Sequence, residues 1–222
     1  MYDLVKGILE FRKNSLKDYQ KRFGYLKMGQ TPGTLFITCS DSRVVPNLFT
    51  STHPGHLFVV RNAGNIIPPH DTITSETASV EFAISQLPIE NIIVCGHSDC
   101  GAMQAILDKK ENLPKSLQFW LGFGEQGCNC GTLKGLIKQN VLKQIDHLLT
   151  FPLIKQKVDA GLLKIWGWYF DVGTGEVFAY EEDVNDFILL DEKEGQQILN
   201  RLEKLHEKVE NSMTTKIGSE LE

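Results

Sequence analysis

The first part of the chain has apolar residues in a helical pattern. Between Asp3 and Leu26 they recur roughly three or four positions apart, which is typical of one or two amphipathic helices. The stretch Gln30-Thr31-Pro32-Gly33 then interrupts the pattern, because proline and glycine favour turns. We therefore expect residues 1–33 to form an N-terminal helical arm.

Short apolar runs replace this pattern after residue 33. They predict buried strands at Thr34–Thr38, Leu57–Val60 and Asn91–Cys95, with a helix at about Thr74–Leu87 between the last two. Parallel strands need a crossover connection, and a helix is the usual one. The order of strand, helix and strand therefore indicates a parallel sheet with crossover helices.

Helical and strand patterns continue through the rest of the chain. Gly101–Asp108 and Leu133–Leu149 are predicted helices, and two strands are expected around Gly173-Thr174-Gly175. A last predicted helix has an apolar stripe on one face, which fits packing on the chain's own core or on a second subunit. The two strands are Lys164–Val172 and Glu176–Tyr180, and the stripe consists of Ile198, Leu202, Leu205 and Val209.

Length and composition favour one main domain. With 222 residues, 41% of them hydrophobic and 23% charged, the chain can form one substantial core but is short for two. We expect an α/β fold with a mainly parallel central β-sheet flanked by helices, an N-terminal helical arm and a C-terminal helix. The expected single domain, residues 1–222, divides into the arm (1–33), an α/β core that carries the functional site (34–190), and a C-terminal helix and tail (191–222).

Charge and cysteine content limit the partners and the compartment. A net charge of −5 and a pI near 5.7 disfavour a general nucleic-acid or anionic-membrane binder. The chain does not open with a basic segment followed by an apolar one, and no apolar run approaches the ~18 residues of a membrane span. Five cysteines, an odd number, fit a reducing compartment. We expect a cytoplasmic protein whose thiols are available as ligands.

Two short motifs follow predicted strands. The sequence CSDSR (39–43) comes directly after the first strand, and GHSDCGAM (96–103) comes directly after the third. Functional residues of an open parallel sheet gather beyond the carboxyl ends of its strands. We therefore expect Cys39, His97 and Cys100 to lie close together.

A pair of cysteines and a histidine is a ligand set that suits Zn²⁺. Three protein ligands leave a fourth tetrahedral position free for water, which is the mark of a catalytic zinc site. Cys100 is expected at the start of a helix, where the helix N-terminus favours the thiolate form that binds metal.

The alternation in CSDSR directs further chemistry to the same place. In extended backbone, Cys39, Asp41 and Arg43 point to one side. Asp41 would accept a hydrogen bond from a zinc-bound hydroxide, and Arg43 would keep this carboxylate ionised and oriented.

The two motifs, together with FVVRNAGN (58–65), resemble those of the β-class carbonic anhydrases over roughly residues 30–107. The resemblance implies an enzyme with one Zn²⁺ per chain, held by Cys39, His97 and Cys100, that interconverts CO2 and bicarbonate. It implies a catalytic dyad of Asp41 and Arg43. It also implies an α/β fold and a homodimer or a higher assembly of dimers, without nucleic-acid or membrane partners.

The resemblance also assigns a substrate pocket and a subgroup. Some of the pocket residues would face across the dimer interface; the implied positions are Gln30, Phe58, Phe82 and Gly101, and Phe82 is often tyrosine in relatives. In an allosterically inhibited subgroup, a tryptophan lies three positions before the first cysteine ligand, and the residue equivalent to Asp41 closes the zinc site. This chain has Phe36 at that position, which favours an open, water-bearing zinc.

Zinc rather than Asp41 alone is expected to provide most of the catalysis. General-base catalysis typically contributes ~10²–10⁴-fold. Zinc lowers the pKa of bound water from about 15.7 to about 7 in a carbonic anhydrase with a different ligand set. Since two thiolates neutralise the formal charge of Zn²⁺, Asp41 would help by accepting the hydroxide proton. The hypothesis is that zinc-bound hydroxide attacks CO2, with a rate that rises toward alkaline pH.

Two other functions remain open. One is a zinc hydrolase that acts on carbonyl sulfide or carbon disulfide, and the other is a non-enzymatic module in which zinc only supports folding. The remaining candidate residues have simpler interpretations. Cys95 is interpreted as a small buried hydrophobe, His53 and His56 as part of a solvated turn, and His147 and His206 as ordinary histidines. His70 is either an ordinary histidine or a residue that borders the site. Cys128 and Cys130 are interpreted as loop thiols, and Gly122–Gly127 as a loop rather than a nucleotide site.

Overall fold

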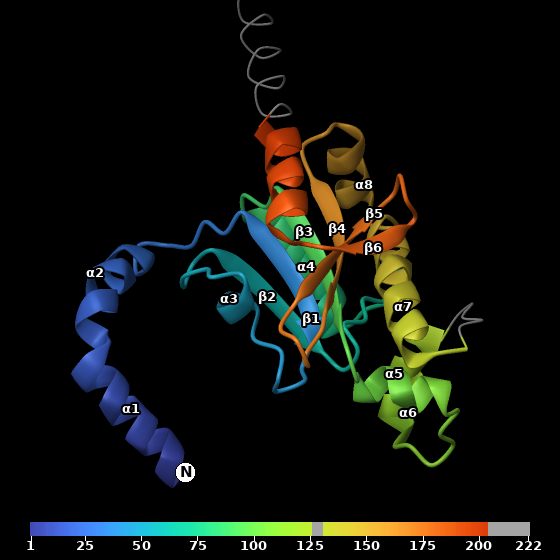
Figure 1. The fold of residues 1–222 in the computed structure, drawn as a ribbon, viewed down its shortest axis with the longest axis horizontal. Coiled ribbons are helices and arrows are strands. Elements are labelled where there is room, and N and C mark those ends of the chain that lie inside the picture. Colours follow the sequence, from blue (N-terminus) through green and yellow to red (C-terminus); the bar gives the residue numbers. More distant parts are fainter. Residues whose placement is uncertain (126–130, 204–222) are drawn as a thin grey trace, which may run out of the picture.

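A six-stranded sheet forms the centre of the protein in a computed structural model that describes residues 1–125 and 131–203 (Figure 1). The strand order is β2-β1-β3-β4-β5-β6. The first four of these strands in the order are parallel, and β5 and β6 are antiparallel additions. The strands are β1 (Thr34–Cys39), β2 (Leu57–Asn62), β3 (Asn91–His97), β4 (Lys164–Phe170), β5 (Val177–Glu181) and β6 (Asp186–Leu189). The expected mainly parallel α/β fold is confirmed.

Helices precede, connect and flank these strands. They are α1 (Tyr2–Asn14), α2 (Leu16–Leu26), α3 (Pro46–Phe49), α4 (Ser75–Gln86), α5 (Gly101–Leu107), α6 (Lys115–Glu125), α7 (Leu133–Leu148) and α8 (Pro152–Asp159). Residues 192–203 are also helical. The predicted helices of the arm, α4, α5 and α7 are confirmed within a few residues. The sequence patterns did not predict α3, α6, α8 or β6.

The glycines at 122 and 124 were expected in a loop, and the structure corrects this: both lie in α6. A Cβ atom at position 124 would lie 3.2 Å from the Cδ1 atoms of Ile66 and Ile106. Gly124 therefore serves close packing of the helix rather than a turn. Cys128, Cys130 and His206 lie outside the described residues, as do Leu205 and Val209 of the predicted C-terminal stripe.

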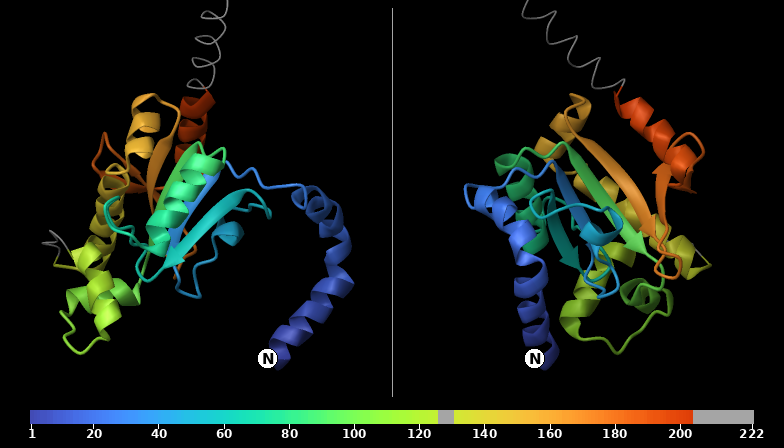
Figure 2. Two further views of the ribbon diagram at one scale, coloured as in Figure 1. Left: turned by 180° about the vertical axis from the view of Figure 1, so that it is seen from behind. Right: turned by 60° about the vertical axis from the view of Figure 1, so that its left-hand side comes forward.

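One face of the sheet carries the main hydrophobic core. Helices α4, α7 and α8 lie on this side of the sheet (Figure 2). Their side chains pack against alternate residues of β1 and β3, such as Ile37 and Val94. Gly96 in β3 allows α7 to approach closely, because a Cβ atom there would lie 2.8 Å from Ile137 and 2.9 Å from Val141. This contact fixes α7 over the end of β3.

The opposite face of the sheet has a smaller buried cluster. Phe36, Ile93, Cys95 and Phe170 form it, together with Val44. The helix of residues 192–203 lies over this face and borders a groove of about 360 Å³. Trp166 and Trp168 line the sheet side of the groove, and Ile198 and Leu202 line the helix side.

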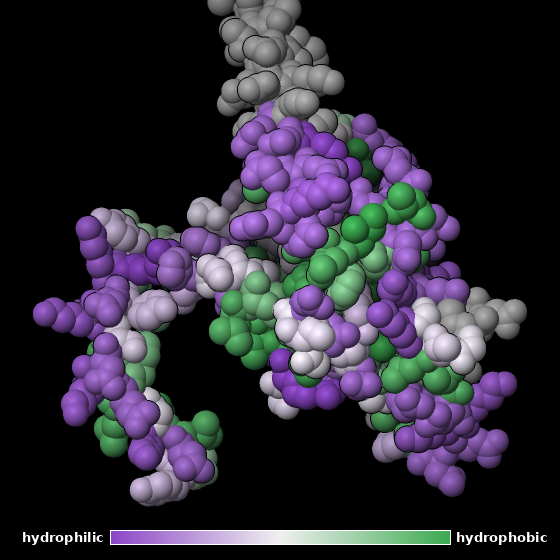
Figure 3. Space-filling model, in the orientation of Figure 1, coloured by the Kyte–Doolittle hydropathy of each residue, from purple (hydrophilic) through white to green (hydrophobic). Residues whose placement is uncertain are grey.

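The N-terminal arm extends away from the sheet (Figures 1 and 2). Within the described chain, no residue of α1 or α2 is buried. Leu4 and Ile8 of α1 are 66% and 59% exposed, and hydrophobic patches interrupt the polar surface of the arm (Figure 3). Helix α2 contacts the turn before β2, where Arg22 Nη1 lies 3.5 Å from His56 Nε2. The helices of the arm thus form without covering their apolar side.

Candidate metal centre

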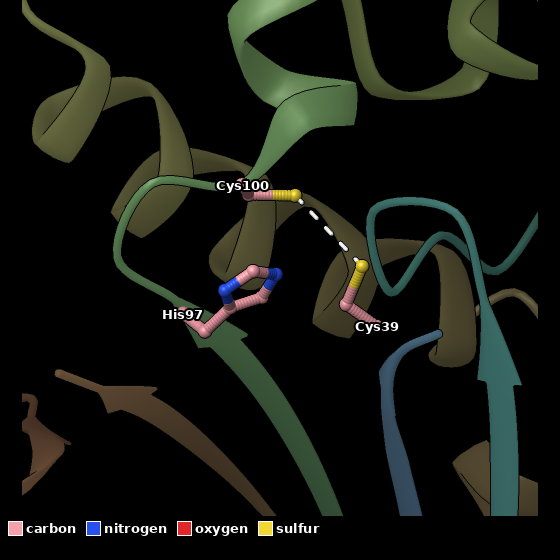
Figure 4. A group of neighbouring side chains, drawn as sticks. All are labelled: Cys39, His97 and Cys100. Carbon is pink, nitrogen blue, oxygen red and sulfur yellow. Dashed lines mark hydrogen bonds between the residues drawn. The ribbon is translucent and has the colours of Figure 1, made fainter. Parts of the chain in front are cut away.

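Three potential metal ligands meet at the carboxyl end of the sheet. Cys39 is the last residue of β1, His97 is the last residue of the neighbouring parallel strand β3, and Cys100 lies directly before α5. Their side chains are buried and point toward one another (Figure 4). The two sulfur atoms are 3.9 Å apart, and the possible ligand atoms all lie within 4.8 Å of one another. The structure therefore brings the predicted ligands together.

A neighbouring carbonyl determines which ring nitrogen of His97 carries the proton. Nδ1 lies 2.8 Å from the carbonyl oxygen of Ser98, which only accepts hydrogen bonds, so Nδ1 carries the proton. Nε2 then has a free lone pair, and it is buried without a hydrogen-bond partner among residues 1–125 and 131–203. A buried unpaired polar atom is costly. A metal ion bound to Nε2 and the two sulfurs would satisfy it.

The two thiols differ in acidity when no metal is bound. The pKa of Cys39 is lowered to about 4, chiefly because the Cys100 thiol donates a hydrogen bond to its sulfur, with help from the Gly64 N–H at 3.4 Å. The pKa of Cys100 is raised, first because it donates that bond to the Cys39 anion and then by burial. The expected lowering at Cys100 is thus wrong for the metal-free pair. Backbone groups at the start of α5 do lower its pKa, but the adjacent anion outweighs them. Metal binding would displace the shared proton.

Asp41 and Arg43 form a two-point ion pair beside the cluster. Arg43 Nε donates to Asp41 Oδ1 at 2.9 Å, and Arg43 Nη2 donates to Asp41 Oδ2 at 2.8 Å. These side-chain hydrogen bonds are the largest reason that the pKa of Asp41 lies well below its usual range. Asp41 Oδ2 is 3.9 Å from His97 Nε2. An ionised, oriented carboxylate therefore lies next to the place where the three potential ligands converge.

A second arginine supports the same loop and was missed in the sequence. Arg61 of β2 donates from Nε to the carbonyl of Cys39 at 3.1 Å and from Nη2 to the carbonyl of Asp41 at 2.8 Å. Arg43 also donates to the carbonyl of Asp99 at 3.1 Å, which links the two motif loops. Arg61 lies within FVVRNAGN, so the motif was the available signal, but its spacing did not indicate the acceptors.

The predicted substrate-pocket residues do not gather around this chain's own cluster, with one exception. Gly101 is the first residue of α5, beside Cys100. Phe58 pairs with Leu35, four residues before the level of Cys39, which corresponds to about 13 Å along a strand. Phe82 packs near Phe58, with ring centroids 5.9 Å apart, and Gln30 is exposed in the segment before β1. The pocket assignment of Gln30, Phe58 and Phe82 therefore stays a prediction about a site shared with another chain.

Two simpler interpretations from the sequence are confirmed. Cys95 is fully buried in the smaller cluster, and burial raises its pKa to about 12. His53 and His56 are exposed in the turn before β2. Neither feature is part of the metal centre.

Comparison with known proteins identifies the family. A family model described as carbonic anhydrase matches residues 34–177. The chain is 39% identical to a carbonic anhydrase of Synechococcus elongatus over 86% of this chain and 76% of that protein. It is 40% identical to a carbonic anhydrase of Synechocystis over 85% of this chain and 74% of that protein.

The solved structures agree. The β-carbonic anhydrase CcaA superposes with a TM-score of 0.80 at 36% identity and covers 86% of this chain and 92% of that one. The chain belongs to the β-carbonic anhydrase family. Tetrameric members from Sordaria macrospora superpose with a TM-score of 0.72 at 26% identity, covering 80% of this chain and 95% of theirs. Among the described residues of this β-carbonic anhydrase, no helix has the length and hydrophobicity needed to cross a membrane.

Proposed function

We propose that this family member is a zinc enzyme that interconverts CO2 and bicarbonate. The observation that carries the proposal is the buried convergence of the two thiols of Cys39 and Cys100 with the unpartnered Nε2 of His97. This donor set suits Zn²⁺ and leaves one coordination position open. One zinc per chain would be held by these three residues. When bound, zinc acts as a Lewis acid on water, the role for which carbonic anhydrases are the standard example.

The Asp41–Arg43 pair is proposed to handle the proton at this site. The Arg43 guanidinium holds Asp41 ionised, so its carboxylate can accept a hydrogen bond from a water molecule beside His97. The same ion pair favours an open site, because an Asp41 bound to a metal would have to leave Arg43. Phe36 supports this view, since it is buried against Phe49 and Trp168 and offers no polar group there.

We further propose a homodimer or an assembly of dimers, in which each pocket uses residues of both chains. The arm leaves its apolar side uncovered, and Phe58, Phe82 and Gln30 lie away from the cluster of their own chain. A second copy would supply a surface for the arm and would bring these residues toward the partner's cluster.

Cytoplasmic location, and the division into arm, zinc-binding core and C-terminal helix, belong to the same proposal. Free thiols at Cys39, Cys95 and Cys100 in the described chain fit a reducing compartment.

Stopped-flow CO2 hydration on a zinc-quantified sample tests the proposed reaction. We expect activity in proportion to bound zinc, loss of activity on chelation, and recovery when zinc is restored. A sulfide-release assay with carbonyl sulfide or carbon disulfide distinguishes the hydrolase alternative. A chelated protein that stays folded but inactive argues against zinc as a purely structural element. Zinc-loaded protein without CO2 hydration would overturn the proposal.

A further inference from the structure

Helix α7 presents polar residues to the core. Asn140, Gln144 and His147 recur at intervals of four and three residues, which places them on one side of the helix. All three are buried, with exposed fractions of 1%, 0% and 5%. Buried polar side chains destabilise a core unless they are hydrogen-bonded. Their partners therefore indicate why this side of α7 is not apolar.

The three side chains bond to one another and to a single loop. His147 Nδ1 lies 2.8 Å from the carbonyl of Ile67, and Gln144 Oε1 accepts the Ile67 N–H at 2.9 Å. Gln144 Nε2 then donates to Asn140 Oδ1 at 2.9 Å, and Asn140 Nδ2 donates to the carbonyl of Gly64 at 2.9 Å. The three residues thus hold both ends of loop 64–67, and we call them the α7 polar ladder.

The loop held by the α7 polar ladder begins with a residue that contacts a potential metal ligand. The N–H of Gly64 donates to the sulfur of Cys39 at 3.4 Å. Gly64 and Asn65 have φ values of 85° and 49°, and the left-handed region is unfavourable for the non-glycine Asn65. A Cβ atom at Gly64 would also lie 2.8 Å from Met103 Cε. Bonds from outside the loop therefore help to hold this backbone conformation against the sulfur, both from the α7 polar ladder and from Asn62, which bonds the N–H and the carbonyl of Ile66 at 2.8 Å.

A hydrogen bond to a thiolate withdraws electron density from its sulfur. Two thiolates cancel the formal charge of Zn²⁺ and weaken it as a Lewis acid. An N–H donor on one of them restores part of that acidity, and groups around first ligands tune metal sites in this way. The position of the Gly64 N–H is thus a means of adjusting the metal.

We propose that Asn140, Gln144 and His147 are positioning residues that hold the Gly64 N–H on the Cys39 sulfur and so set how strongly this ligand donates to the metal. The inference rests on the proposed zinc site at Cys39, His97 and Cys100. It assigns the polar residues of a core helix to the metal centre, although none of them is in direct contact with the ligands by the hydrogen bonds described.

The test replaces two members of the α7 polar ladder. Gln144→Met keeps the side-chain volume but removes the bonds of Gln144 to Ile67, Asn140 and His147. Asn140→Ala removes the bond to Gly64 and is a second route if the first variant does not fold. Ile154→Ala is the matched control, because this apolar residue of α8 is 1% exposed and its loss lowers stability without removing a ladder bond. All proteins are prepared as full chains loaded with ¹¹³Cd²⁺, Co²⁺ or Zn²⁺.

The readouts report the sulfur and the metal rather than activity. We expect the Gly64 amide proton to couple to ¹¹³Cd through the sulfur in the native and control proteins, and the coupling to be lost in both ladder variants. The sulfur-to-cobalt charge-transfer band should shift in the ladder variants alone. Competition with a chelator should show a zinc affinity that differs from the native value by about 10-fold, the lower end of the effect of groups around metal ligands.

The outcomes separate two failures. Ladder variants that fold and keep the native coupling, cobalt band and zinc affinity would overturn the inference and leave the proposed function intact. Native protein that binds none of these metals at the three ligands would overturn the proposed function itself. A control variant that shifts as much as the ladder variants would assign the effect to general loss of stability and contradict the positioning role.

Discussion

The carboxyl end of the sheet and the N-terminal arm are built in opposite ways. At the sheet end, the potential ligands Cys39, His97 and Cys100 are buried, and loops from three different places in the chain bond to one another around them. In the arm, helices α1 and α2 bury none of their residues within the described chain and expose an apolar stripe. One region is completed by its own chain, and the other has an apolar stripe that its own described chain leaves uncovered.

The difference indicates how the enzyme divides its work. Isolated helices of this length are marginal in water, so the arm needs packing to persist. Two residues expected in the substrate pocket lie away from the potential ligands of their own chain. Gln30 follows α2 of the arm, and Phe58 lies in β2 four residues before the level of Cys39. We infer that metal binding belongs to one chain and that substrate binding and the arm depend on two.

The largest expected effect comes from breaking the ligand set. Cys39→Ser or His97→Ala should reduce stoichiometric zinc to a trace and abolish CO2 hydration, because two remaining ligands bind a catalytic zinc poorly. Metal analysis after gel filtration measures this. Cys95→Ala is the control, since that thiol is buried outside the cluster, and it should retain zinc. Stoichiometric zinc in Cys39→Ser would rule out the proposed ligands.

A smaller effect is expected at the carboxylate beside the ligands. Asp41→Ala should keep zinc but lower turnover by ~10²–10⁴-fold, the usual contribution of a general base. Stopped-flow assays on zinc-quantified protein measure it. The matched control is Asp71→Ala, which removes a fully exposed carboxylate outside the site. Native turnover in Asp41→Ala would show that the Asp41–Arg43 pair has only a structural role.

The proposed role of the arm in dimer formation can be tested by replacing apolar residues of its exposed stripe with glutamate. Leu4→Glu with Ile8→Glu should dissociate dimers, since burial of one such side chain stabilises by about 1.5–3 kcal/mol and about 3 kcal/mol corresponds to roughly 100-fold in affinity. Sedimentation should show monomers that still bind zinc but hydrate CO2 slowly. Lys6→Glu with Lys13→Glu changes polar positions of the same helix and should leave the assembly intact. Fully active monomers would contradict a pocket shared between chains.

The smallest expected effect concerns pH and the α7 polar ladder. Burial is the main reason that the pKa of His147 is lowered from its ordinary value of 6.5. A lowered pKa in the folded state means that the unfolded state binds the proton more readily, so this residue favours folding above 6.5 and loses that contribution as the pH falls through the folded-state value. The free energy of unfolding can be measured with urea about one pH unit above and about one unit below 6.5. It should change less between these two pH values in His147→Gln than in the native protein.

The control for this experiment is His53→Gln, which removes an exposed histidine and should leave the pH dependence unchanged. An unchanged pH dependence in His147→Gln would mean that the buried imidazole is not a source of acid sensitivity. The same variant weakens one end of the ladder, so its metal content should be measured in parallel.

Much of the parallel sheet and the convergence of the three potential ligands could be predicted because they leave strong local signals. Continuous apolar runs mark β1 and β3, and Cys39 and His97 follow from where these strands end. The unpredicted elements are short or lack periodicity. Helix α3 has only four residues, and α6 contains glycines that act in packing rather than in a turn.

The rest of the site depends on contacts between distant segments. The proton on Cys100 could not be placed, because it depends on the distance to the Cys39 sulfur rather than on the start of a helix. Asn140, Gln144 and His147 read as unremarkable helix residues until their partners in loop 64–67 are known. The location of Phe58 relative to the ligands likewise required the register of β2 on β1.

Arg61 has a mechanical consequence for the proposed chemistry. One planar guanidinium grips the carbonyls of both Cys39 and Asp41, at 3.1 and 2.8 Å. The backbones that carry the Cys39 thiol and the Asp41 carboxylate are therefore bonded to the same planar group, which restrains the distance between them. The spacing on which the proposed proton handling would depend is thus restrained by a residue that belongs neither to the three potential ligands nor to the Asp41–Arg43 ion pair.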